Sequence, residues 1–124
     1  MQRGSMVITT LATALFCFLL PVRAAGQRDF AAIDLHALAA PPELKRSPKK
    51  LVEYLVAPAR DDVEKARAIF RWLANNVDYD IASYRSGATS SLTAEEVLAS
   101  GKAMCSGYAT LFEELAQLAG LSLI

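Results

Sequence analysis

The sequence has few of the residues that bind metals or form disulfides. It holds two cysteines, Cys17 and Cys105, and a single histidine, His36, which together do not make a ligand set. The formal net charge is zero, because 13 basic residues are scattered among 13 acidic ones. The composition therefore indicates neither a nucleic-acid-binding surface nor a metal site, and we expect no cofactor.

Long apolar runs are also scarce, with one exception near the start. Arg3 belongs to a short polar head, and residues 7–20 are apolar apart from threonine and cysteine. This run is shorter than the roughly 20 residues that a membrane-spanning helix needs. Val22 and Ala24 suit a signal peptidase, so the pattern predicts a cleaved secretory signal over residues 1–24 and a secreted or periplasmic protein. The membrane would then be contacted only through the transient signal; an uncleaved anchor is the alternative.

Export would leave one thiol in an oxidising compartment, because Cys17 lies inside the predicted signal. A lone cysteine in such a place is buried and inert, paired with another chain, or retained for its reactivity. Cys105 is therefore the residue whose setting decides between these alternatives.

Residues 25–47 are predicted to be a lead-in, short helical or extended, followed by a linker at Pro41 and Pro42. This stretch contains His36. A catalytic role would require His36 to fold back onto Cys105, so we expect a surface or partly packed histidine instead.

Residues 48–124 carry mainly helical patterns. Ser47 followed by Pro48 predicts one helix start, and Asp61 with Glu64 three places later predicts a second, capped start. The second helix is the clearest in the chain, and its Trp72 is expected in the core rather than in a substrate cleft. The apolar residues at helical spacing in this second helix are Val63, Ala66, Phe70, Leu73 and Val77.

A loop is expected from Asp78 to Ser91. Thr93 and Glu96 then form a capping-box pattern for a short helix over 94–99, which Gly101 ends. A further helix is expected from Cys105 to Gly120, and the last four residues, LSLI, look like the opening of a strand. The apolar residues at helical spacing in this last helix are Tyr108, Leu111, Phe112, Leu115 and Leu118.

The position of Cys105 at a helix start favours a thiolate. Unpaired backbone N–H groups and the positive end of the helix dipole stabilise negative charge there, and Lys102 adds positive charge nearby. The same N–H groups could hold the oxyanion of an acyl-transfer reaction. Gly107 leaves the backbone bare, so that a substrate or another segment can approach. Small residues and cysteine are also common at buried helix starts, so this pattern leaves a core thiol open.

The run from Asp62 to Asp80 and the segment GKAMCSGYATLFEELAQLAGL resemble the transglutaminase-like superfamily, in the branch of the kyphoscoliosis peptidase. The resemblance covers roughly residues 60–121, and Cys105–Ala109, CSGYA, is its most specific part. Gly101 stands four places before the cysteine, where members of this family usually have glycine two or three places before it.

The resemblance implies an α+β papain-like (transglutaminase-like) domain, of which residues 48–124 are the predominantly α-helical N-terminal half. It implies that Cys105 is the nucleophile, assisted by a histidine and then an aspartate later in the chain. Neither partner can be assigned in this sequence, so we expect a truncated domain. The implied activity is acyl transfer or hydrolysis on protein or peptide amides, by a peptidase, transamidase or deamidase. The alternatives are a non-catalytic binding or scaffold module of the same fold, and a helical piece with a buried structural thiol.

Overall fold

Helices make up most of the residues that the computed structural model describes, which are 27–88 and 92–122. The predicted signal over 1–24, including Cys17, and the end of the LSLI segment lie outside the described residues. No helix within the described ranges is long and apolar enough to cross a membrane. In chain order the elements are α1 (Ala31–Leu38), the 3-10 helix η1 (Pro42–Arg46), α2 (Pro48–Val56), α3 (Asp62–Asn76), β1 (Asp78–Tyr79), α4 (Ile81–Ser86), α5 (Ala94–Ser100), β2 (Lys102–Ala103) and α6 (Cys105–Leu118).

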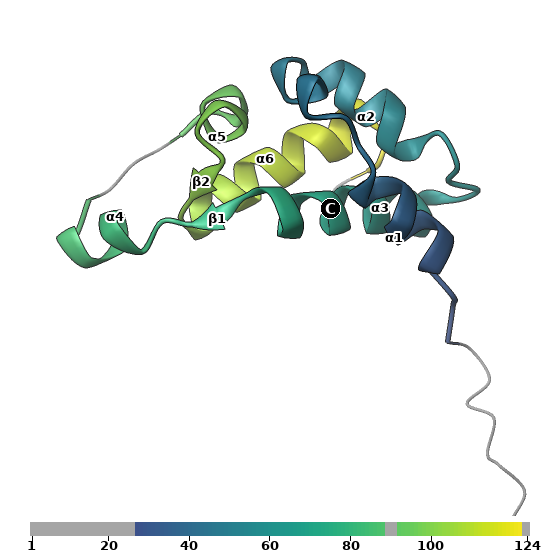
Figure 1. Cartoon of the computed structure of the whole chain (residues 1–124), viewed down its shortest axis with the longest axis horizontal. Coiled ribbons are helices and arrows are strands. Elements are labelled where there is room, and N and C mark those ends of the chain that lie inside the picture. The colour runs from purple at the N-terminus through teal and green to yellow at the C-terminus, as the bar shows by residue number, and fades with distance from the viewer. Residues whose placement is uncertain (1–26, 89–91, 123–124) are drawn as a thin grey trace, which may run out of the picture.

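The long helix α3 is the centre of the packing, because α1, α2 and α6 all contact it (Figure 1). One half of the predicted capping box is present at its start: the Asp61 carboxylate accepts a hydrogen bond from the backbone N–H of Glu64 at 2.9 Å. The return bond goes one residue earlier than predicted, because the buried Glu64 carboxylate accepts from the backbone N–H of Arg60 at 2.8 Å. Hydrogen bonds from the Arg60 side chain hold the pKa of Glu64 below its usual value.

The buried face of α3 agrees with the predicted spacing in part. The helix itself is confirmed, and Leu73 and Val77 are buried as the spacing predicts. Val63 and Phe70, in contrast, are 50% and 53% exposed, and Ile69 is buried although the spacing did not indicate it. Apolar residues occur on more than one face of this helix, so spacing alone does not select the face that packs. Phe70 lies under the guanidinium of Arg67, 5.8 Å from the ring centroid. The prediction that Trp72 is a core residue is confirmed.

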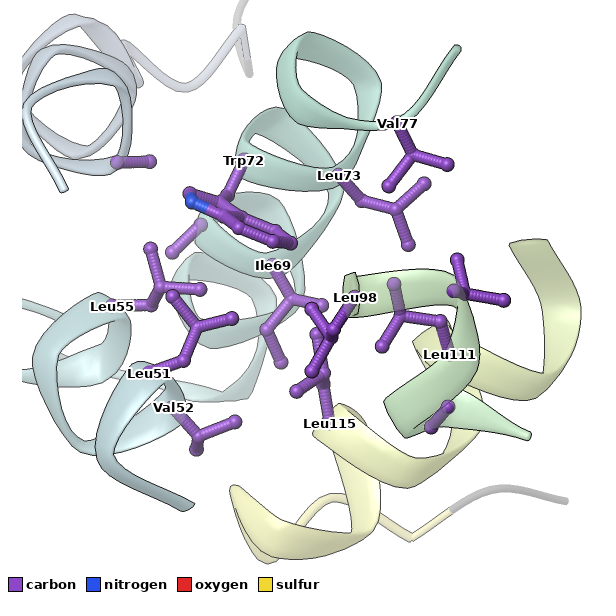
Figure 2. Packing of buried hydrophobic residues seen from close by; sticks show 14 of the residues in the cluster. Leu51, Val52, Leu55, Ile69, Trp72, Leu73, Val77, Leu98, Leu111 and Leu115 are labelled. Carbon is purple, nitrogen blue, oxygen red and sulfur yellow. The ribbon is translucent and has the colours of Figure 1, made fainter. Parts of the chain in front are cut away.

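The hydrophobic core lies where α2, α3, α5 and α6 meet. Figure 2 shows Ile69 and Trp72 of α3 on the side that faces Leu51 and Leu55 of α2. Complete burial of a leucine or isoleucine side chain contributes about 2 kcal/mol to the free energy of folding. Leu111 and Leu115 of α6 are also fully buried, so the core holds α6 against α2 and α3. The fully buried large side chains are Trp72, Leu51, Leu55, Ile69, Leu111, Leu115 and Val97.

The stretch predicted as lead-in and linker contains α1, which packs on α3. Ile33 on α1 is buried, and the Asp34 carboxylate accepts hydrogen bonds from Nε and an Nη of Arg67 at 2.7 and 2.6 Å. This pairing holds the pKa of Asp34 below its usual value. His36 stacks on the ring of Tyr54 at 4.3 Å, and its Nε2 lies 2.7 Å from the Tyr54 carbonyl oxygen. A partly packed histidine, as predicted, is confirmed.

The segment predicted as a loop after α3 contains β1 and α4. β1 pairs in parallel with β2, with Asp78 opposite Lys102. The backbone N–H groups of Asp78 and Asp80 donate to the carbonyl oxygens of Gly101 at 2.8 Å and Ala103 at 3.0 Å. Because parallel strands end at the same edge, the helices that follow them, α4 and α6, begin at the same end of the domain (Figure 1).

The short helix α5 follows its prediction closely. Thr93 and Glu96 form both halves of the capping box. Gly101 follows the helix in the left-handed conformation, with φ of 65°, which glycine adopts at little cost. After this turn the chain continues directly into β2 and then into α6.

Candidate active site

Cys105 is the first residue of α6, and its side chain is exposed and free. Met104 precedes it in extended conformation, and no side chain caps the helix. The first backbone bond of the helix runs from the N–H of Tyr108 to the carbonyl oxygen of Met104 at 3.1 Å. The N–H groups of the first turn thus lie at the helix end that carries the exposed thiol. The alternative of a buried structural thiol is wrong in this structure.

Gly107 allows α6 to pack closely on the segment before it. Gly107 is buried, and a Cβ added there would lie 2.7 Å from the Cβ of Ala103 and 3.3 Å from Cγ2 of Val97. The sequence predicted that either a substrate or another segment would approach the backbone at Gly107. In this structure it is another segment, the one that carries Ala103. The close packing sets the position of the first turn of α6, and with it that of Cys105.

Three tyrosine rings lie near one another, and one of them, that of Tyr108, belongs to α6. The Tyr108 hydroxyl, one turn after Cys105, donates a hydrogen bond to the carbonyl oxygen of Val77, and burial raises the pKa of Tyr108. The ring of Tyr79 stacks on that of Tyr108 at 6.4 Å, and Tyr84 meets Tyr79 edge-on at 6.3 Å. Sequence analysis missed Tyr79 and Tyr84 because they fall in the segment predicted as a loop. The one signal for them was two tyrosines in the short stretch DYDIASY.

Asp80 lies close to this site, but its carboxylate caps the start of α4. Its carboxylate accepts hydrogen bonds from the backbone N–H of Ser83 at 3.0 Å and the Ser83 hydroxyl at 2.7 Å. The backbone bond from Ser83 is the main reason that the pKa of Asp80 is lowered, and the charge of Lys102 adds to this effect. Asp80 is thus an ionised helix cap.

His36 is not brought to Cys105. It is held against α2 by Tyr54, and α1 lies at the opposite end of the domain from β1, β2 and the start of α6 (Figure 1). Within residues 27–88 and 92–122, no group of three or more histidine, cysteine or acidic side chains is placed to hold a metal ion. The described part of the chain therefore presents an exposed thiol at a helix start with an aromatic neighbour, and His36 lies away from it.

Comparison with known proteins agrees with the resemblance seen in the Cys105 segment. The model of the transglutaminase-like superfamily matches residues 49–122. Kyphoscoliosis peptidase from Homo sapiens is 36% identical over 72 residues, which is 58% of this chain and 11% of that protein.

Kyphoscoliosis peptidase from Mus musculus is 30% identical over 90 residues, which is 73% of this chain and 14% of that protein. The chain thus spans a small fraction of the length of these curated relatives. No solved structure gives a significant match. Because the family model covers more than half of the sequence and includes Cys105, this chain belongs to the transglutaminase-like superfamily.

Proposed function

We propose that this chain carries the nucleophile of a thiol enzyme that transfers or hydrolyses acyl groups on protein or peptide amides. The observation that carries the proposal is the exposed thiol of Cys105 at the first, uncapped position of α6. A helix start stabilises a thiolate through its unpaired N–H groups and its dipole. Membership of the transglutaminase-like superfamily supports acyl transfer or peptidase chemistry in general.

In the proposed reaction the Cys105 thiolate attacks the carbonyl carbon of a carboxamide or peptide bond. The oxyanion that forms is held by backbone N–H groups of the first turn of α6. Collapse of this intermediate breaks the C–N bond, and the amine or ammonia leaves with the proton that the general base took from the Cys105 thiol. The thioester that remains is then cleaved by water, giving hydrolysis, or by an amine, giving acyl transfer.

The general base in this proposal is a histidine oriented by an aspartate, in the chain order Cys, His, Asp that the family resemblance implies. Neither role falls to His36 or Asp80, whose side chains are engaged with Tyr54 and Ser83. We therefore propose that residues 48–124 are the N-terminal helical half of a papain-like α+β domain, whose sheet contributes the two partners.

We further propose that residues 1–24 are a secretory signal and that the enzyme acts outside the cytoplasm. The apolar run over 7–20 and the small residues before the expected cleavage site support this. The intact mass of the exported protein is expected to correspond to a chain that starts at Ala25. A mass that retains the first 24 residues would contradict the proposal.

The test of the enzyme proposal uses the protein at its natural full length. A glutamine-containing peptide and a fluorescent amine are supplied, and ammonia release and amine incorporation are measured together. We expect Cys105→Ala to abolish both, while the matched control Ser106→Ala, which changes the next exposed residue, retains them. Peptide-bond cleavage is followed in parallel by mass spectrometry.

Iodoacetamide alkylation tests the nucleophile without a substrate. Cys105 is expected to react well below the pH at which free cysteine reacts, because the helix start favours the thiolate. If Cys105 reacts only like free cysteine and no turnover is found, the non-catalytic binding or scaffold module becomes the better account. Turnover that survives in Cys105→Ala would assign the chemistry to another residue.

A further inference from the structure

The beginning of α6 is attached to the rest of the domain on two sides. On the side of β2, Gly107 packs on Ala103. On the side of α3, the Tyr108 hydroxyl donates a hydrogen bond to the carbonyl oxygen of Val77. Within the described residues, this is the one side-chain hydrogen bond that joins α6 to another part of the domain, because the others made by α6 side chains stay inside the helix.

The Val77 carbonyl is a firmly held acceptor. Val77 is buried, and its own N–H donates to the carbonyl oxygen of Leu73 at the end of α3. The next residue, Asp78, is bonded in turn to Gly101. Over residues 27–88 and 92–122, the Tyr108 hydroxyl is the only hydrogen-bond partner of the Val77 carbonyl oxygen. Burial, and to a lesser extent the charge of Asp78, raise the pKa of Tyr108, so the hydroxyl keeps the proton that it donates.

The turn that this bond fastens is the one that carries the exposed thiol. The first N–H in the hydrogen-bond ladder of α6 is that of Tyr108, which donates to Met104. The N–H groups of Cys105, Ser106 and Gly107 have no partner in the part of the chain that the structure describes. Such groups stabilise a negative charge together only while the turn keeps its helical form. Helix ends open readily, and no side chain caps this one.

We propose that Tyr108 is a positioning residue for Cys105, because its bond to Val77 holds the first turn of α6 closed and keeps the three free N–H groups together beside the thiol. This inference rests on the proposed function, since it takes Cys105 to be the nucleophile. Tyr108 acts through the backbone and contacts neither the sulfur nor the reacting amide. Removal of its hydroxyl lets the turn open, and the thiolate and the oxyanion that follows it then lose stabilisation.

A tyrosine that contributes only to stability is the competing account. In that account Tyr108→Phe destabilises the domain, but every folded molecule keeps a normally reactive Cys105. The control for this account is Asp34→Asn, which weakens the pairing with Arg67. It acts on α1, at the opposite end of the domain from the start of α6 (Figure 1). A second control, Tyr84→Phe, removes the same hydroxyl group from a tyrosine that is 67% exposed.

The experiment compares the full-length protein with these three variants at a temperature at which circular dichroism shows all four to be folded. The rate of iodoacetamide alkylation of Cys105 is followed against pH by mass spectrometry of the peptide that contains it. Hydrogen exchange is measured on the peptide over residues 105–112. Turnover of a glutamine-containing peptide with an amine gives kcat and KM. None of the variants alters a charged residue on β1, β2 or α6, so a changed alkylation profile reports the state of the turn.

We expect Tyr108→Phe to slow alkylation at neutral pH about threefold and to move the alkylation profile to higher pH. We expect it to lower kcat about tenfold with little change in KM, because the free N–H groups act mainly on the charge that forms during the reaction. Hydrogen exchange over residues 105–112 is expected to become several-fold faster. Tyr84→Phe and Asp34→Asn are expected to match the unmodified protein in all of these measurements.

Unchanged hydrogen exchange over residues 105–112 in Tyr108→Phe would overturn the inference. So would an alkylation profile that does not move, or one that moves equally in Asp34→Asn. Failure of the proposed function is seen separately, in an unmodified protein that shows no turnover and whose Cys105 reacts like free cysteine. Hydrogen exchange decides the inference in that case too, because faster exchange in Tyr108→Phe alone supports the closed turn and equal exchange in all four proteins refutes it.

Discussion

The hydroxyl of Tyr108 donates a hydrogen bond to the backbone carbonyl of Val77, linking the first turns of α6 to the end of α3. Val77 is buried directly before β1, so this bond joins the helix that begins with Cys105 to the strand that pairs with β2. The same tyrosine ring stacks on Tyr79. One side chain thus connects the helix that begins with Cys105, the end of α3 and the ring of Tyr79 on β1.

Replacement of Tyr108 by phenylalanine tests this link. Tyr108→Phe keeps the ring and removes the hydroxyl, which leaves the Val77 carbonyl without its partner. We expect the free energy of unfolding to fall by about 1 kcal/mol, as measured by urea denaturation. Tyr84→Phe is the matched control, because Tyr84 is 67% exposed, and it is expected to have little effect. An equal loss in both variants would show that the Val77 bond contributes nothing specific.

Gly107→Ala tests the close packing of α6 on β2. Alanine favours a helix over glycine by about 1 kcal/mol, but its Cβ would lie 2.7 Å from the Cβ of Ala103. Overpacking of this kind costs about 1–3 kcal/mol, so we expect a net loss of stability and altered alkylation of Cys105. The control Ser106→Ala changes an exposed neighbour. A more stable Gly107→Ala variant would mean that the two segments separate easily.

Two neighbouring aromatic residues on α3 test which face of the helix is buried. Trp72→Ala is expected to cost about 3–5 kcal/mol or to abolish cooperative unfolding, because Trp72 is 2% exposed. Phe70→Ala is expected to cost about 1 kcal/mol, because half of its ring is already in water. The comparison is made by thermal unfolding followed by circular dichroism. A larger loss for Phe70 than for Trp72 would contradict the burial of Trp72 and the exposure of Phe70 in this structure.

Acid is expected to weaken the contact between α1 and α3. The pKa of Asp34 is lowered in the folded protein, chiefly by the hydrogen bonds from Arg67. Its contribution to stability is therefore complete above its unfolded pKa, about 3.9, and is lost as the pH falls through the folded value. Asp34→Asn is expected to cost roughly 1 kcal/mol at pH 7 and much less at pH 2.

The measurement for Asp34 is the urea midpoint at pH 7 and at pH 2 in the two proteins. Glu53→Gln is the control, since Glu53 is an exposed acid on α2 without an ion pair among the described residues. The difference between the unmodified protein and Asp34→Asn is expected to shrink in acid. A difference that stays constant with pH would show that the Asp34 carboxylate does not stabilise the fold through its charge.

The parts of the fold that were predictable are those with local causes. The capping box of Thr93 and Glu96, the left-handed Gly101 and the helix start at Cys105 all depend on residues within one turn of each other. The superfamily was predictable for a similar reason, because CSGYA is a short continuous motif. Features of this kind are determined by neighbouring residues, so the sequence is enough to predict them.

The parts that were missed depend on distant partners. β1 exists because the N–H groups of Asp78 and Asp80 bond to Gly101 and Ala103, more than 20 places later, and nothing in DYDIASY indicates that pairing. The exposed position of Phe70 likewise depends on how α3 is covered by α1 and α2. Spacing along one helix shows which faces are apolar, whereas the choice of the buried face belongs to the assembled domain.

The parallel pairing of β1 with β2 also bears on how a change in chain length would affect Cys105. Its hydrogen bonds fasten Asp80 to Ala103 and Asp78 to Gly101, so the connection between α4 and α5 lies within a segment whose two ends are fixed. Doubling the length of a loop costs only about 0.6 kcal/mol in closure entropy. Insertions or deletions between α4 and α5 would therefore leave Cys105 where it is. The surroundings of Cys105 can thus change with the length of this connection while Cys105 keeps its place at the start of α6.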